Sequence, residues 1–241
     1  MNTLLRQITR QIGRMLPVAC LFVLPVHAAD LSHPVTNTLK QRVESCAMCH
    51  GEQGQGGANG FYPRIGGKPA EYLYHQLLNF RDGRREYAPM EYMVRPLSDK
   101  YLHEIAEYFA NKHPDFPDTH PPKLSDKAMA RGKQLVSEGD PSKGIPACSS
   151  CHGKQLHGVE PGIPGLVGLP YEYISAQIGA WQTDTRAANK PDCMAKVAAK
   201  LSPADISAVS GWLASQTADA SARPAPAGSV HTPMTCGSQE N

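Results

Sequence analysis

The sequence has almost no excess charge of either sign. Its 24 Lys and Arg residues stand against 22 Asp and Glu residues, a formal net charge of +2, which does not indicate a nucleic acid as the partner. No stretch reaches the roughly 20 apolar residues that span a bilayer. Seven cysteines in 241 residues are too few for a disulfide-rich miniprotein. We therefore expect a soluble protein of about two domains, in which the positions of the cysteines carry the information.

The first 28 residues are typical of a secretory signal peptide. Three arginines and no acidic residue precede the apolar run Met15–Leu24, which contains Pro17 and is too short to span a membrane. The triplet Val-His-Ala ending at Ala28 is suited to cleavage. We expect residues 1–28 to be removed and the mature protein to be exported to the periplasm. The alternative is an uncleaved membrane anchor.

The rest of the chain contains an internal repeat of about 100 residues. Three segments recur: CAMCHG at 46–51 as CSSCHG at 148–153, PRIGGKPAEYLYHQ at 63–76 as PGLVGLPYEYISAQ at 164–177, and a methionine seven residues before Leu-Ser at 90 and again at 194. Such a repeat means that one small domain is present twice.

The repeat and its flanking segments divide the chain into domains. We assign residues 29–110 to the first domain and 125–216 to the second. Between them, residues 111–124 contain four prolines and no helical periodicity, which predicts a semi-rigid extended linker. Residues 217–241 are rich in Ala, Ser, Pro and Thr, so we expect a mostly disordered tail.

Both copies show helical periodicity, and no window alternates as a strand would. Helices are predicted at Thr36–Cys46, Ala70–Phe80 and Ser98–Asn111 in the first copy, and at Ser125–Ser137, Tyr171–Trp181 and Ser202–Ser215 in the second. Ser98 is suited to an N-cap and Pro203 to the first helical position. The predicted fold class is all-α.

The repeated Cys-x-x-Cys-His motif is typical of covalent haem attachment. Two thiols one helical turn apart can each add to one vinyl group of a porphyrin, and the adjoining histidine can bind the iron. The alternatives are a redox-active dithiol, which is expected in a βαβ context that is absent here, and a zinc site, which does not explain a histidine after both pairs. We predict two covalently bound haem c groups, attached through Cys46 and Cys49 and through Cys148 and Cys151, with His50 and His152 as iron ligands.

Met90 and Met194 are the predicted second axial ligands. They lie 40 and 42 residues after their histidines and occupy equivalent places in the repeat. A thioether ligand stabilises ferrous iron and raises the reduction potential. Met93 is a competitor in the first copy, but the second copy has Val197 there.

These motifs resemble class I cytochrome c, and two such domains in one exported chain resemble the dihaem cytochrome c4 family. The resemblance covers roughly residues 36–216. It implies two cytochrome c folds related by a pseudo-twofold axis, with haem propionates near the domain interface. It also implies that the carbonyl of Pro63 accepts the Nδ1 proton of His50, and that of Pro164 the Nδ1 proton of His152.

Several features depart from the family pattern. Gly132 would allow a close helix crossing in the second domain, whereas the matching position of the first is Leu39. Cys193 directly precedes Met194, and a further cysteine, Cys236, lies in the tail. Three interpretations of these thiols are open: an internal disulfide, a free or partner-linked thiol, or iron ligation by Cys193.

The resemblance implies an electron carrier that exchanges electrons with membrane respiratory complexes or a terminal oxidase. With both irons saturated by His and Met, the protein would have no substrate chemistry of its own. The alternative is a dihaem oxidoreductase, for example one that oxidises thiosulfate, or the cytochrome subunit of a dehydrogenase. Only Cys193 favours that alternative.

A basic cluster follows the second predicted helix of the first copy. Its members are Arg81, Arg84 and Arg85. We expect a solvated helix end. The alternative is contact with haem propionates or with an acidic partner.

Overall fold

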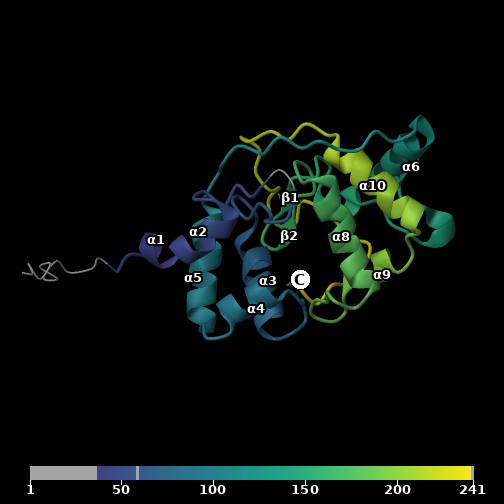
Figure 1. Cartoon of the computed structure of the whole chain (residues 1–241). Helices are drawn as coiled ribbons and strands as arrows, with labels where there is room; N and C mark the ends of the chain where they lie inside the picture. Colours follow the sequence, from purple (N-terminus) through teal and green to yellow (C-terminus); the bar gives the residue numbers. More distant parts are fainter. Residues whose placement is uncertain (1–36, 58–59, 240–241) are drawn as a thin grey trace, which may run out of the picture. The chain divides into compact units, whose positions relative to one another are not determined.

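The computed structural model of the protein describes residues 37–57 and 60–239, and the predicted signal peptide at 1–28 lies outside these ranges. The first half contains α1 (Leu39–Arg42), α2 (Glu44–His50), α3 (Ala70–Arg81), α4 (Ala88–Val94) and α5 (Asp99–Ala110) (Figure 1). The second half contains α6 (Asp126–Ser137), the 3-10 helix η1 (Pro141–Lys143), α7 (Ser149–His152), α8 (Tyr171–Gln182), α9 (Cys193–Ala198) and α10 (Pro203–Ala214).

Polar caps set the starts of the predicted helices. Three serine side chains each accept a hydrogen bond from a backbone N–H of the first turn: Ser98, Ser125 and Ser202. The N-cap role of Ser98 and the place of Pro203 at the start of α10 are confirmed. The first predicted helix is instead two short helices, because the chain leaves helical geometry at Val43.

Besides α7 and η1, two helices and two strands were not predicted. α4 and α9 have 7 and 6 residues, too few for a helical period to stand out from single residues. β1 (Gly158–Val159) and β2 (Ile163–Pro164) pair antiparallel over two residues each, which is too short for alternation to be recognised. All four short elements lie next to residues of the predicted haem sites.

Each half has its own apolar core. Leu102 and Phe109 of α5 are almost fully buried in the first half, and Leu135 of α6 and Leu213 of α10 in the second. No cluster of buried apolar residues in the described chain combines the two halves. The chain therefore folds as two tandem helical domains, which together belong to one compact unit, Asn37–Asn241.

The crossing of α6 and α10 depends on Gly132. A Cβ atom there would overlap the carbonyl of Ala208 and would lie 2.8 Å from the Cβ of Trp212. The two helices are also joined by Arg131, whose Nε donates to Asp205 at 2.8 Å. This confirms the predicted close crossing; at the matching position of the first half, Leu39 packs partly buried against its core.

The proline-rich linker is extended and contacts both halves. It contains no helix or strand between residues 112 and 125. Arg64 of the first half donates to the carbonyl of Asp115 at 2.8 Å and stacks on the ring of Phe116. Thr119 donates to the carbonyl of Ala214, at the end of α10. Figure 1 shows the linker and part of the tail along the same side of the molecule, and both contact the region of Gly168 through Phe116 and Ala218.

The tail differs from the expected disorder. Ala225 exchanges two backbone hydrogen bonds with the segment of β1: its N–H donates to Gly158 at 2.9 Å, and its carbonyl accepts from Glu160 at 2.8 Å. Further on, Cys236 forms a disulfide with Cys193. The tail is held by a disulfide and by backbone hydrogen bonds, and it buries little apolar surface. Its amino-acid composition therefore gave no sign that it would be ordered. Within the described residues, no helix is both long and apolar enough to cross a membrane.

Replacing Gly132 with Ala should destabilise the second domain by about 1–3 kcal/mol, because the added methyl must push α10 away from α6. Guanidinium chloride unfolding monitored by circular dichroism measures the change. Gly179→Ala is the matched control: this glycine also lies within a helix, but a Cβ there meets nothing within 4 Å. The control should be neutral or stabilising by up to about 1 kcal/mol. Equal losses in both variants would contradict the close crossing.

Candidate haem-binding sites

In each half a short helix carries the repeated cysteines and histidine. Cys46 and Cys49 lie one turn apart on α2, and His50 is its last residue. In the second half, Cys148 caps α7, which contains Cys151 and ends at His152 (8% exposed, as is His50). All four cysteines are free of disulfides. This spacing presents two thiols and an imidazole on one side of a helical turn.

A glycine and a proline complete each site. Gly51 and Gly153 have φ of 84° and 83°, a conformation that favours glycine and that ends the helix directly after the histidine. The chain then returns so that a proline carbonyl accepts a hydrogen bond from the imidazole. The Nδ1 atoms of His50 and His152 lie 2.8 Å from the carbonyl oxygens of Pro63 and Pro164.

These hydrogen bonds determine which ring nitrogen is available. A carbonyl can only accept, so the proton is on Nδ1 and the lone pair is on Nε2. Burial lowers the pKa of both histidines, against the opposing effect of the hydrogen bond. The charge of Arg85 further lowers the pKa of His50, and that of Lys68 the pKa of His152. Both imidazoles are therefore neutral at pH 7 and suited to bind iron through Nε2.

The thiols do not suit a redox-active dithiol. Burial raises the pKa of Cys148 to about 12 and also raises those of Cys46 and Cys151. Reactive Cys-x-x-Cys pairs have lowered thiol pKa values. The described residues also contain no group of three or more His, Cys, Asp or Glu side chains placed to hold a metal ion. The residues fit a porphyrin held by two thioether bonds and one imidazole.

The two methionines lie at equivalent places on the two short helices. Met90 is the third residue of α4 and packs, half-buried, against the core that contains Phe80 and Leu102. Met93, one turn later on the same helix, is 39% exposed. Met194 is the second residue of α9. Met90 is therefore more buried than Met93, the other candidate for the second iron ligand in the first half.

Asp192 and a disulfide hold the segment that carries Met194. One carboxylate oxygen of Asp192 accepts from the N–H of Ala195 at 3.0 Å. The other accepts from the N–H of Ala188 at 2.7 Å and from Trp181 Nε1 at 3.3 Å. The neighbouring Cys193 is bonded to Cys236, with their Cα atoms 5.4 Å apart. The structure therefore contains the internal disulfide, which was one of the three interpretations of these thiols.

The basic cluster separates into two parts. Arg81 and Arg84 form ion pairs with Asp82, and Arg81 forms another with Asp99. For Arg85, the expectation of a solvated helix end is wrong, because its guanidinium reaches across to Gln177 of the second half at 2.6 Å.

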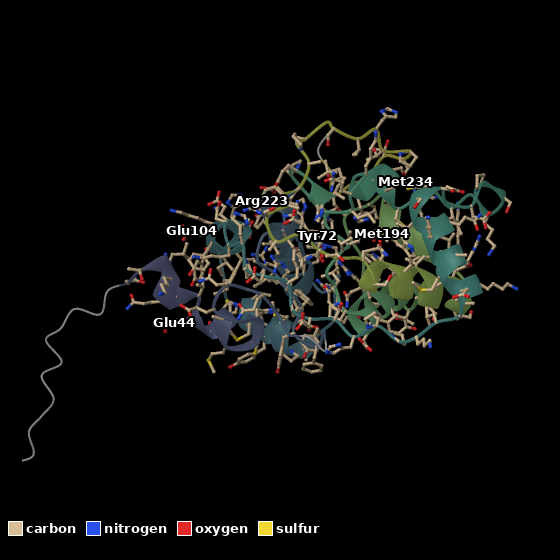
Figure 2. All side chains as sticks on the ribbon, turned by 90° about the horizontal axis from the view of Figure 1, so that it is seen from above. Glu44, Tyr72, Glu104, Met194, Arg223 and Met234 are labelled. Atoms are coloured by element: carbon tan, nitrogen blue, oxygen red, sulfur yellow. A yellow bond between two sulfur atoms is a disulfide. The ribbon has the colours of Figure 1, made fainter. Side chains whose placement is uncertain are left out.

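Sequence reasoning missed Arg186. It is 5% exposed and donates to Tyr72 of the first half at 3.3 Å. Figure 2 labels Tyr72 near the middle of the view. The signal was available, since Arg186 follows Arg85 by 101 residues, the same offset that relates Tyr173 to Tyr72. A single arginine repeated in both copies was not recognised from the sequence, because its importance lies in its contacts with the other half.

Comparison with known proteins supports the same assignment. The family model described as cytochrome c matches residues 40–126. A thiosulfate dehydrogenase electron acceptor of Thiomonas intermedia is 40% identical over 172 residues, covering 71% of this chain and 78% of the relative. Cytochrome c4 of Pseudomonas aeruginosa is 33% identical over 171 residues, covering 70% and 82%. The crystal structure of reduced cytochrome c4 from Pseudomonas stutzeri superposes with a TM-score of 0.61 at 30% identity, covering 73% of this chain and 95% of that one.

Two helical domains, each with a Cys-x-x-Cys-His site whose histidine is buried, define a dihaem c-type cytochrome of class I. Within that class, the chain belongs to the cytochrome c4 family. It carries two covalently bound haem c groups and transfers electrons.

Replacing both Cys193 and Cys236 with Ser should lower the free energy of unfolding by about 4 kcal/mol, because the bond closes a loop between residues 43 positions apart. Denaturant unfolding of the holoprotein measures the loss. Peptide mapping without reduction should find the two cysteine peptides linked in the unaltered protein. Uptake of an alkylating reagent by both cysteines of the native protein would show that the bond is absent.

Proposed function

We propose that the protein is a periplasmic electron acceptor for a thiosulfate-oxidising dehydrogenase, and that it delivers electrons to a membrane respiratory complex or a terminal oxidase. The observation that carries this proposal is the disulfide of Cys193. A thiol next to Met194 was the one feature that favoured an enzyme with an unusual iron ligand. With that sulfur bonded to Cys236, the site retains the features of a carrier.

The proposed ligand sets are His50 with Met90 and His152 with Met194. When bound, the two haems supply one-electron redox chemistry. The chain's contribution is to keep both imidazoles neutral and oriented by the carbonyls of Pro63 and Pro164, each at 2.8 Å. With a histidine and a methionine as ligands, each iron would have no free position for a substrate, and the structural change between oxidation states would be small.

The choice of donor rests on similarity and on stoichiometry. The relative from Thiomonas intermedia, at 40% identity, is named as an electron acceptor of thiosulfate dehydrogenase. Oxidative coupling of two thiosulfate ions forms one S–S bond and releases two electrons, which matches two one-electron centres in one chain.

Two observations support the periplasm as the compartment. The first is the predicted signal peptide at residues 1–28, which covalent haem attachment after export would require. The second is the disulfide between Cys193 and Cys236, since such bonds persist in oxidising compartments.

Replacing Met90 with Ala should convert one of the two haems to a high-spin form and lower its potential, because the thioether that favours ferrous iron is removed. Visible absorption and a spectroelectrochemical titration measure both effects, and the second haem should keep its potential. Met93→Ala is the control from the same helix and should leave both haems unchanged. If Met93→Ala has the effect and Met90→Ala does not, the proposed ligand is off by one helical turn.

The donor is tested by mixing the oxidised holoprotein with thiosulfate, with and without catalytic amounts of a thiosulfate dehydrogenase. We expect both haems to be reduced only when the dehydrogenase is present, at a rate that rises with its concentration. Stopped-flow absorption follows the reduction. Equally fast reduction by thiosulfate alone would show that the protein is itself an oxidoreductase, and the absence of reduction in both mixtures would reject this donor.

A further inference from the structure

The tail contacts both segments that carry the predicted ligands of the second iron. On one side, Ala225 pairs with the segment of β1: its N–H donates to Gly158, and its carbonyl accepts from Glu160. β1 pairs with β2, which ends at Pro164, and the carbonyl of this proline accepts from His152. The tail is therefore joined to the strand pair that orients the imidazole.

On the other side, the tail is joined to the segment that carries Met194. Cys236 forms the disulfide with Cys193, which directly precedes Met194. The next residue of the tail, Gly237, donates its backbone N–H to the carbonyl of Pro191 at 2.9 Å. A covalent bond and a hydrogen bond thus hold the tail against the chain just before Met194.

Apolar packing holds α9 at its C-terminal end. Val197 and the buried Ala198 contact the apolar core of the second half. Among the described residues, that core does not include Met194, the second residue of the helix. The start of α9 is held instead by the side chain of Asp192, which accepts from the N–H of Ala195, and by the disulfide.

The first half holds its methionine by packing. Met90 lies against the apolar core that contains Phe80 and Leu102. The position of the repeat that matches Cys193 is Pro89, so the first half has no thiol there to cross-link. The two halves therefore fix their methionines by different means.

The segment that leads to the methionine is longer in the second half. Met90 follows Arg85 by five residues, whereas Met194 follows Arg186, the repeat equivalent of Arg85, by eight. A longer segment can adopt more conformations, so ordering it costs more free energy. The disulfide restricts these conformations in advance, which lowers the entropic cost of placing Met194 on the iron.

We propose that Cys193 and Cys236 are positioning residues whose disulfide holds Met194 as a ligand of the second iron. Breaking the bond then lowers the reduction potential of the second haem and leaves that of the first unchanged. A thioether stabilises ferrous iron, so a loosely held Met194 dissociates first from ferric iron. The ferric state is then favoured, and the potential falls. This inference rests on the proposed function, in which Met194 binds the second iron.

The test is a spectroelectrochemical titration of the holoprotein in which Cys193 and Cys236 are both replaced with Ser, with intact mass confirming two haems. We expect one of the two one-electron steps to move to lower potential. Its equilibrium constant for reduction should fall about tenfold, or about 59 mV. The long-wavelength absorption band of ferric His/Met haem should lose most of the second haem's share. If both steps and the band are unchanged, the disulfide stabilises the fold only, and the proposal is wrong.

Gly132→Ala is the matched control. It destabilises the same domain at the crossing of α6 and α10, where the added Cβ meets Ala208 and Trp212. Both potentials and the whole band should remain. The same shift in this variant would show that lost stability alone is the cause, which would overturn the proposal.

Met194→Ala separates this inference from the proposed function. If it removes the second haem's share of the band and the double cysteine variant does not, Met194 is the ligand but the disulfide does not position it. If Met194→Ala leaves the band intact, the proposed ligand is wrong, and the inference falls with it.

Should the double variant not fold, the bond is opened in the assembled holoprotein, where both cysteines are half-buried. A dithiol reductant supplies two electrons and two protons: the S–S bond breaks to give two thiols, and the reductant closes to its own disulfide. The thiols are capped with N-ethylmaleimide, and the haems are then reoxidised and titrated. We expect the same shift of one step, and unchanged potentials would reject the proposal.

Discussion

The structure depends on one interaction made twice, the hydrogen bond from a buried imidazole Nδ1 to a proline carbonyl. In each half it links the end of the cysteine-bearing helix to the loop that follows, at 2.8 Å in both. It fixes the tautomer and leaves Nε2 to the iron. Pro63 and Pro164 each lie six residues before the proline that precedes the next helix, Pro69 before α3 and Pro170 before α8. The bond therefore ties the loop that leads to the next helix to the end of the cysteine-bearing helix in both halves.

The two halves use the same plan but are stabilised differently. The first relies on α3 and α5 packing around Leu102 and Phe109. The second has a close crossing at Gly132, the strands β1 and β2, and a tail cross-linked beside Met194. Duplicated domains are free to diverge in this way, because only the residues that hold the cofactor must remain in register. The extra bracing of the second half acts on the two segments that carry Pro164 and Met194.

The contact between the halves has an electrostatic consequence. A cation pair without a carboxylate partner is unfavourable in the protein alone. Arg85 and Arg186 share the neutral amide oxygens of Gln76 and Gln177, so hydrogen bonds without an ion pair join the two halves here.

The sequence by itself determined the features that depend on local chemistry. The spacing of Cys46, Cys49 and His50 identifies the cofactor, and the serine caps and helical periodicity locate the longer helices. The tertiary structure decided what depends on contacts between distant residues. Which thiol bonds to Cys193, and whether Arg85 faces solvent or the other half, are set by packing that no local pattern records. The physical reason is that a motif binds through neighbouring residues on one turn, whereas a disulfide or a buried guanidinium needs a partner that only the folded chain brings close.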